Sequence, residues 1–413
     1  MANICDYLRW RGDISLEERP FNDVDNIILS ALSYLDFTGI VPGERSGGTI
    51  VLSRACRKLI ERGAGDVTHY VRSLAKVDTT FVDLIASSRR FGGAVLHSYV
   101  DIVDEQRSLQ FSALRIDLSS DETYVSYRGT DSTLVGWRED FMLSFEVTEA
   151  QREALAYLDR AGAWAAEQDR RLLVGGHSKG GVLAEYAAAK CADEVRERIL
   201  RVYSNDGPGM SSDVMRVDGR SVLGDKLVRI VPSYSVVGML FARQGDPRVI
   251  VQSSGTGIGQ HDPTTWQVTR SGVMEAPALQ PDCVLLNDAI ASWASDLSLA
   301  ERERVTNEVF DALATGGATR FDEITATNDG LQQVLSALNN TDGRTREVLA
   351  ALVDRIVNTS VEAVRKSAQD TLSAWRKGTK EAAEMAARKV FKAGSVALRK
   401  GEIKIVLPHS THN

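Results

Sequence analysis

A serine lies between two glycines where the sequence changes from a strand pattern to a helix pattern. Residues 171–175 resemble a short buried strand, Gly176-His177-Ser178-Lys179-Gly180 follows, and residues 180–193 are rich in alanine. In this context Gly-x-Ser-x-Gly is typical of a sharp turn that presents a nucleophilic serine at a helix N-terminus, where backbone N–H groups favour an oxyanion. We therefore predict that Ser178 is a nucleophile and that His177 is structural. The alternative is an ordinary turn with a serine cap.

A nucleophilic serine needs a base, which in hydrolases with this turn comes later in the chain. Three histidines follow Ser178, and two of them, His409 and His412, belong to the last five residues. Chain ends tend to fray, so these two are poorly suited to a fixed site. His261, which follows a predicted strand over 247–253, is the predicted base.

The acid that would orient this base is expected at the end of another strand. Asp206 follows a predicted strand over 199–205 and should emerge at the same edge of the sheet as Ser178. Its alternative role is only to shape the Asp-Gly-Pro-Gly turn. Asp262 is the alternative acid, although it would have to fold back upon its neighbour His261.

An oxyanion hole needs a second donor besides the N–H of Lys179. The predicted strand over 122–128 leads into Gly129-Thr130-Asp131, where the N–H and hydroxyl of Thr130 could face the same oxygen. Thr130 and Lys179 are therefore the predicted oxyanion hole, although Gly-Thr-Asp also suits an ordinary turn. This chemistry requires neither a metal nor a cofactor, and we predict none.

Strands and helices alternate along the part of the chain that carries these residues. Alternation of this kind predicts an α/β fold with a mostly parallel central sheet covered by helices. The predicted strands are 94–100, 109–117, 122–128, 171–175, 199–205, 226–232 and 247–253, and the predicted helices are 22–37, 148–168 and 180–193.

Beyond about Val284 the strand pattern ends, and helical periodicity continues to roughly Leu398. An apolar stripe begins near residue 344, and residues 376–404 hold nine basic residues against three acidic ones. We expect a helical C-terminal extension over 316–413 that packs on its own protein or on a partner helix. Peripheral contact with an anionic membrane is the alternative.

Composition is that of a folded protein with no general affinity for polyanions. The chain has 413 residues, 43% of them hydrophobic and 25% charged, and a formal net charge of -7. This charge argues against nucleic acid as a partner. Four widely spaced cysteines indicate reduced thiols rather than disulfides or a zinc site. Because no signal peptide or membrane span is apparent, a cytoplasmic location is expected, although export without a leader would leave the same pattern.

Several of these motifs, in this order, resemble the class three (fungal-type) lipases, and more closely their bacterial relatives, the Mbeg-like family of unknown function. The resemblance covers roughly residues 1–315. It rests on Arg128-Gly129-Thr130-Asp131 with Trp137, on Gly176 to Gly181, on Asp206-Gly207-Pro208-Gly209, on Gln260-His261-Asp262-Pro263 with Trp266, and on N-terminal motifs such as Trp10-Arg11-Gly12-Asp13 and Val24-Asp25-Asn26. It implies a lipase-like α/β-hydrolase domain over 1–315 that cleaves a carboxylic ester, either a small molecule or a lipid.

One departure from the lipase pattern concerns the acid. Class three lipases carry it after the strand that follows the Gly-Ser-Pro turn, whereas Val231-Pro232-Ser233-Tyr234-Ser235-Val236-Val237 contains no carboxylate here. Either Asp206 has taken over this role from one strand earlier, which we favour, or the triad is incomplete. An incomplete triad would suit a weak or inactive hydrolase-fold protein that binds or acts as a scaffold.

Overall fold

The computed structural model describes most of residues 2–284 and short segments beyond them. The residues left out of the first range are 74, 108, 131–137, 140–141, 144, 212–213, 216–218, 243–245 and 282, and the later described segments are 297–298, 300–304, 395–399 and 402–406. The chain divides into two compact units, Met1–Asn287 and Asp288–Asn413. The domain boundary predicted after residue 315 falls outside the described residues and stays a prediction.

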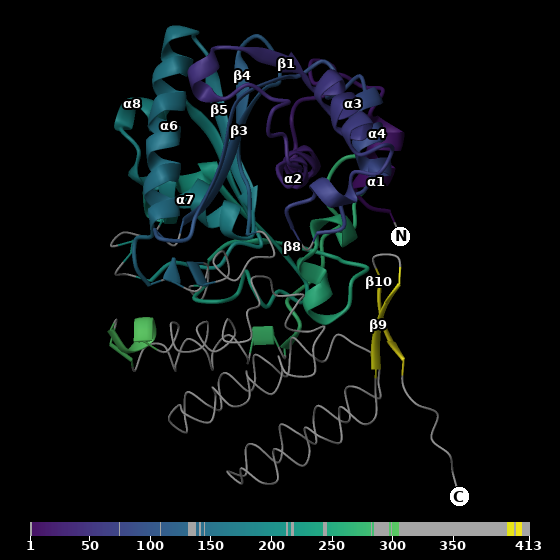
Figure 1. Cartoon of the computed structure of the whole chain (residues 1–413). Coiled ribbons are helices and arrows are strands. Elements are labelled where there is room, and N and C mark those ends of the chain that lie inside the picture. Colours follow the sequence, from purple (N-terminus) through teal and green to yellow (C-terminus); the bar gives the residue numbers. More distant parts are fainter. Residues whose placement is uncertain are drawn as a thin grey trace, which may run out of the picture. The chain divides into compact units, whose positions relative to one another are not determined.

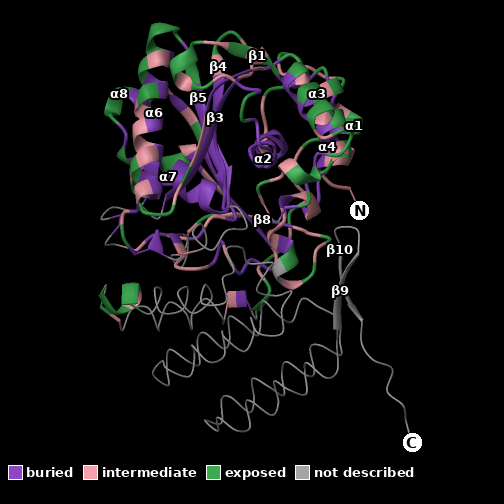
Figure 2. Ribbon diagram, viewed as in Figure 1, coloured by how far each residue is buried: buried purple, intermediate pink, exposed green. Residues whose placement is uncertain are grey.

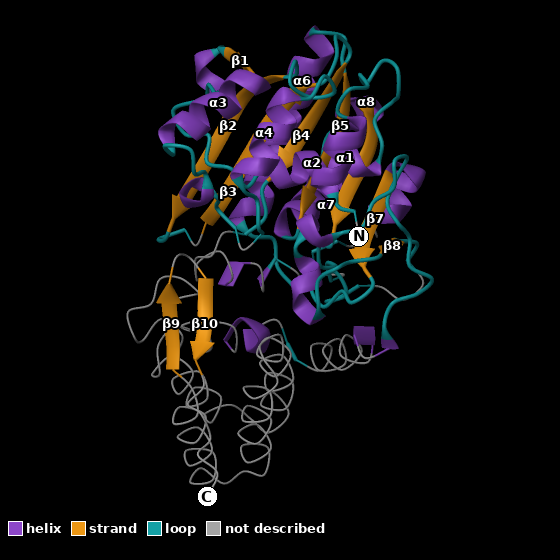
Figure 3. Cartoon of the chain, turned by 90° about the vertical axis from the view of Figure 1, so that its right-hand side faces the viewer, coloured by secondary structure: helices purple, strands orange, loops and turns teal. Residues whose placement is uncertain are grey.

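An eight-stranded sheet forms the centre of the first unit, with its strands in sequence order (Figure 3). Its strands are β1 (Thr49–Val51), β2 (Val95–Asp104), β3 (Leu109–Asp117), β4 (Glu122–Tyr127), β5 (Arg171–His177), β6 (Ile199–Asn205), β7 (Leu227–Pro232) and β8 (Val249–Val251). The strands from β1 to β4 pair antiparallel, and those from β4 to β8 pair parallel. The predicted α/β class, with a mostly parallel central sheet, is confirmed.

Helices cover both faces of this sheet (Figure 1). One face carries α1 (Ile4–Arg11), α2 (Asp23–Leu32), α3 (Leu52–Arg62) and α4 (Thr79–Ser87), and the other carries α6 (Glu149–Glu167), α7 (Lys179–Lys190) and α8 (Asp193–Arg198). Shorter helical turns are α9 (Gly219–Leu223), η1 (Glu44–Ser46), η2 (Thr68–Tyr70), η3 (Gly224–Lys226), η4 (Gly257–His261) and η5 (Pro263–Thr265). No described helix is both long and apolar enough to cross a bilayer.

Alternating side chains of the central strands fill two separate hydrophobic cores. Tyr124 and Leu173 belong to the core beneath the N-terminal helices, whereas their neighbours Val125 and Val174 belong to the core beneath α6 and α7. Successive side chains of a strand point to opposite faces, so a strand buried on both faces is apolar at successive positions. The strands β3, β4 and β5 are accordingly buried at all but one position each (Figure 2).

Helix α2 is shorter than its sequence pattern suggests. It begins at an Asn22 capping box, as the polar start of the 22–37 segment predicts, but it ends at Leu32. Residues after it leave the helix to pair with a distant segment: the N–H of Asp36 donates to the Tyr70 carbonyl, and the N–H of Arg72 to the Tyr34 carbonyl. Pairing across the chain therefore overrides the local helical periodicity.

The prediction of helix up to Leu398 was wrong at its end. Residues 395–399 and 402–406 form the strands β9 (Ser395–Arg399) and β10 (Glu402–Val406), which pair antiparallel. Larger apolar residues recur two positions apart in each segment, Val396 and Leu398 in the first and Ile403 and Ile405 in the second. Only Lys400-Gly401 separates the segments, a spacing typical of tight hairpins. The helices predicted over 305–394 lie outside the described residues.

Candidate active site

Ser178 lies at the sharp turn between β5 and α7. Its φ of 57° and ψ of -129° place a non-glycine residue in a strained backbone region. The turn is held by the N–H of Ser178, which donates to the Asn205 carbonyl of β6 at 2.8 Å. The residue is 8% exposed. This geometry is the one predicted for a serine presented at a helix N-terminus.

Glycines permit the turn because backbone segments meet at it. A Cβ added at Gly180 would lie 2.2 Å from the Tyr127 carbonyl oxygen, and one at Gly176 would lie 2.4 Å from the backbone of Gly180. Both distances are far below van der Waals contact. The two glycines therefore allow α7 to begin directly against the end of β4.

Asp206 follows β6 and is fully buried. One carboxylate oxygen, Oδ2, lies 2.6 Å from Nδ1 of His261. The other, Oδ1, accepts a hydrogen bond from the Ser235 hydroxyl at 2.5 Å and one from the Gly238 N–H at 3.2 Å. The carboxylate thus has partners on both oxygens. Because an ionised carboxylate can only accept, Nδ1 of His261 carries the proton and Nε2 is left as the basic nitrogen.

His261 lies beside the nucleophile turn. Its ring packs on the ring of His177, the residue before Ser178, with centroids 4.5 Å apart. Among the described residues, Ser178 and His261 do not form a hydrogen bond with each other. In hydrolases such a bond is often long before the substrate binds. The structure therefore joins the predicted base to the predicted acid and brings His261 close to Ser178.

Asp262, the alternative acid, serves another purpose. Its Oδ1 accepts hydrogen bonds from the N–H and hydroxyl of Thr264, and its Oδ2 accepts one from the N–H of Lys76. These bonds cap η5 and join the His261 loop to the N-terminal part of the chain. Asp262 thus forms the turn, whereas Asp206 contacts His261, the predicted base.

Thr130 and Lys179 occupy neighbouring strand ends. Tyr127 pairs with Gly176 in the parallel register of β4 and β5, so continuing both segments brings residues 129–130 alongside Ser178 and Lys179. Thr130 is 8% exposed. Lys179 is the first residue of α7, and its backbone N–H has no hydrogen-bond partner among the described residues. That N–H is available to an oxyanion.

The side chain of Lys179 has a structural function that the sequence did not indicate. It is completely buried, and its ammonium group contacts Oε2 of Glu139 at 2.6 Å and the carbonyl of Gln110 at 2.7 Å. Glu139 also accepts the N–H groups of Gln110 and Ala150. This buried ion pair ties the start of α7 to β3 and α6, and so fixes the residue that follows Ser178.

A buried polar network lies beneath the site. The side chains of Asn26 and Asn205 exchange two hydrogen bonds, at 2.8 and 3.1 Å, and Ser30 and Tyr124 complete the network. Asn26 belongs to α2, and Asn205 precedes the acid and accepts the N–H of Ser178. Helix α2 therefore supports the neighbouring ends of β5 and β6, which lead into Ser178 and Asp206.

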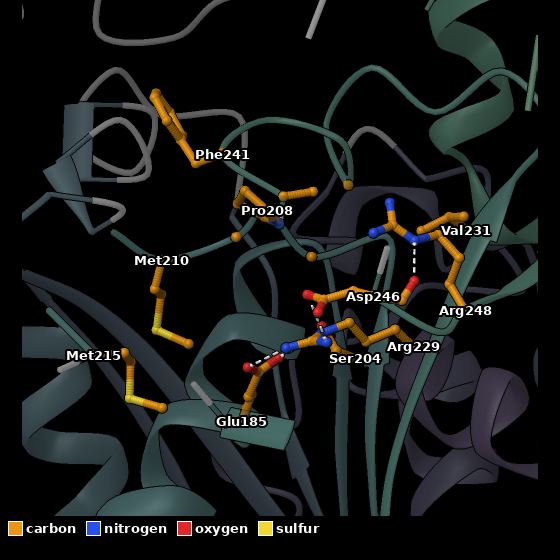
Figure 4. A pocket seen from close by; sticks show the side chains of 15 residues that line it. Glu185, Ser204, Pro208, Met210, Met215, Arg229, Val231, Phe241, Asp246 and Arg248 are labelled. Carbon is orange, nitrogen blue, oxygen red and sulfur yellow. Dashed lines mark hydrogen bonds and ion pairs between the residues drawn. The ribbon is translucent and has the colours of Figure 1, made fainter. Parts of the chain in front are cut away.

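A cavity of about 30 Å³ lies beside residues 207–210, which follow Asp206, between α7, β6 and β7 (Figure 4). Arg229 crosses it and is neutralised by two bonds to Glu185 and one to Asp246. The volume suffices for about two water molecules. Neither Ser178 nor His261 lines this cavity, so it is not where a substrate would react. Within the described ranges no three metal-ligating side chains are grouped as a metal site requires.

Comparison with known proteins gives one family match. The model of a family described as Mbeg1-like matches residues 85–311. No curated protein matches the chain. Among solved structures, the chain is similar to the Rhizomucor miehei lipase propeptide complex, with 14% identity, coverage of 67% of this chain and 76% of that chain, and a TM-score of 0.34. It is also similar to M37 lipase, with 14% identity, coverage of 58% and 88%, and a TM-score of 0.34.

Proposed function

The chain belongs to the Mbeg1-like family, and we propose that it is a serine hydrolase that cleaves a carboxylic ester, with Ser178, His261 and Asp206 as its triad. The observation that carries the proposal is the 2.6 Å contact between Asp206 and His261, beside a serine in a strained turn at a helix N-terminus. A buried acid on Nδ1 of a histidine leaves Nε2 able to take a proton from a nearby hydroxyl.

The first half of the reaction forms an acyl-enzyme. Ser178 Oγ attacks the acyl carbon of the ester while Nε2 of His261 takes the hydroxyl proton. Asp206 stabilises the imidazolium through its bond to Nδ1. When the tetrahedral intermediate collapses, the same proton passes to the oxygen of the leaving alcohol. The negative charge on the carbonyl oxygen is held by the N–H groups of Thr130 and Lys179.

The second half releases the acid. Water takes the place of the alcohol and loses a proton to Nε2 of His261 as it attacks the acyl carbon, and that proton returns to Ser178 Oγ when the acyl-enzyme breaks down. The buried Lys179–Glu139 pair supports both steps, because it fixes the N-terminus of α7 from which one oxyanion donor comes. The proposed substrates are esters of small molecules or lipids.

A fluorophosphonate probe tests this proposal, because it reacts with activated serines and not with ordinary ones. We expect the full chain to be labelled and the Ser178→Ala variant to remain unlabelled, with circular dichroism showing that both are folded. Labelling that survives the substitution would refute the assignment of Ser178. A folded wild-type protein that is neither labelled nor active on a panel of esters of increasing acyl length would instead favour a binding or scaffold protein on the hydrolase fold.

A further inference from the structure

His177, which the triad chemistry does not use, makes two short hydrogen bonds from its buried ring. Nδ1 lies 2.7 Å from the Tyr34 hydroxyl, and Nε2 lies 2.7 Å from the backbone carbonyl of His261. A carbonyl can only accept, so Nε2 of His177 must carry the proton. In the neutral ring Nδ1 is then an acceptor, and the Tyr34 hydroxyl donates to it. Its two partners thus specify a single tautomer of His177.

The surroundings keep this ring uncharged. Burial, and then the adjacent His261, hold the pKa of His177 well below its ordinary value. His177 is buried, and its ring contacts the ring of His261 and the ring of Trp266. A second positive charge there would oppose the imidazolium that forms on His261 during ester cleavage, whereas a neutral ring does not.

The backbone around the base is fixed on each side of His261. Before it, Oε1 of Gln260 accepts the N–H of Tyr234 at 3.0 Å. After it, Oδ2 of Asp262 accepts the N–H of Lys76 at 3.1 Å. At His261 itself, His177 is the donor to the carbonyl within the described part of the chain. This bond is therefore the main-chain anchor nearest to the imidazole, whose ring is held directly by Asp206.

We propose that His177 is a positioning residue, which holds the main chain of His261 in register with Asp206 and Ser178 and is itself set in its tautomer by Tyr34. The proposal rests on the proposed function, since it concerns the base of the same triad. It also assigns a role to the N-terminal segment: Tyr34 follows α2 and lies outside residues 85–311, the part that matches the family model. The base then depends on a residue from the opposite end of the domain.

Two substitutions of the same side chain separate positioning from simple packing. Glutamine can place an amide nitrogen where histidine has Nε2, and so can still donate to the His261 carbonyl. Asparagine reaches only as far as Nδ1 and cannot donate there. We expect His177→Asn to lower kcat for a soluble ester by about tenfold to a hundredfold with little change in KM, because the base is displaced rather than removed. His177→Gln should recover most of that loss.

The proposal would be overturned if the two variants had the same thermal unfolding midpoint and equal activity. This holds whether that activity is normal or impaired. If neither variant folds, NMR of the ¹⁵N-histidine-labelled wild-type chain decides: the expected signature is a neutral His177 with a protonated Nε2, and a protonated Nδ1 would overturn the assignment. The NMR result does not depend on activity. A wild-type chain that shows this tautomer but fails to react with fluorophosphonate would therefore refute the proposed function alone.

Discussion

The carboxylate of Asp206 lies 2.6 Å from Nδ1 of His261, at the end of β6 rather than of β7. Residues 233–242, directly after β7, contain no carboxylate, but they contribute the Ser235 hydroxyl and the Gly238 N–H, which both donate to the other oxygen of Asp206. The segment that lacks an acid thus supports the acid of the preceding strand. In this arrangement His261, the proposed base, contacts a buried carboxylate although the acid comes from the preceding strand.

Asp206→Asn should lower turnover of an ester by about four orders of magnitude, because an amide cannot hold His261 in the tautomer that leaves Nε2 basic. Asp262→Asn is the matched control, since Asp262 caps the adjacent turn and contacts Thr264 and Lys76 rather than the base. Steady-state kinetics of both purified variants checks this. A large loss in the Asp262 variant with an active Asp206 variant would reverse the assignment of the acid.

Lys179→Met should destabilise the protein by about 3–5 kcal/mol, because Glu139 would stay buried without its cation. Adding Glu139→Gln should recover part of this loss, since no charge then remains unpaired in the core. Urea unfolding of the two single variants and the double variant measures the effect. Strictly additive losses would indicate that the two residues do not stabilise the fold as a pair.

His177 should make the protein sensitive to acid. Its pKa is held well below its ordinary value in the folded state, whereas in the unfolded chain it titrates near 6.5. His177 therefore makes its full contribution to the free energy of unfolding at a pH above the pKa that it has in the unfolded chain. Below it, the unfolded state binds a proton that the folded state does not, so the free energy of unfolding falls as the pH falls, by up to about 1.4 kcal/mol per pH unit.

Urea unfolding at about pH 7.5 and about pH 5.5 tests this linkage. The wild-type chain should lose more stability between the two conditions than the His177→Gln variant, which has no group to titrate at that position. Equal losses in the two proteins would mean that other groups cause the acid sensitivity.

Deletion of residues 344–413 should leave hydrolysis of a short soluble ester largely intact, because Ser178, Asp206 and His261 all lie within the compact unit Met1–Asn287. We propose that the removed part, with its basic excess over 376–404, makes membrane or partner contacts. Sedimentation with anionic vesicles should therefore weaken. A truncated chain that unfolds or loses short-ester activity would show instead that this part belongs to the hydrolase.

The sequence by itself determined the strand, turn and helix around Ser178, because the Gly-x-Ser-x-Gly motif and the strand and helix patterns on either side of it form one continuous segment of the chain. It also placed Asp206 and His261 after strands whose ends share one sheet edge, since parallel strands leave their carboxyl ends together. The periodic spacing of apolar residues that predicts helices and strands is likewise a local property of the sequence. Where they failed, at the end of α2 and at β9, pairing between separate segments replaced the predicted helix.

Only the tertiary structure decided which groups hold the candidate triad in place. Ser235 is 29 residues from Asp206, Glu139 is 40 from Lys179, and Tyr34 is 143 from His177. A buried hydrogen bond between such partners depends on how the sheet, α2 and α6 pack. In the sequence, each partner resembles an ordinary serine, glutamate or tyrosine. The tertiary structure also showed that Asp206 and not Asp262 contacts His261, and so supports the proposal of Asp206 as the acid, because a carboxylate orients a base through its position in space and not through its distance along the chain.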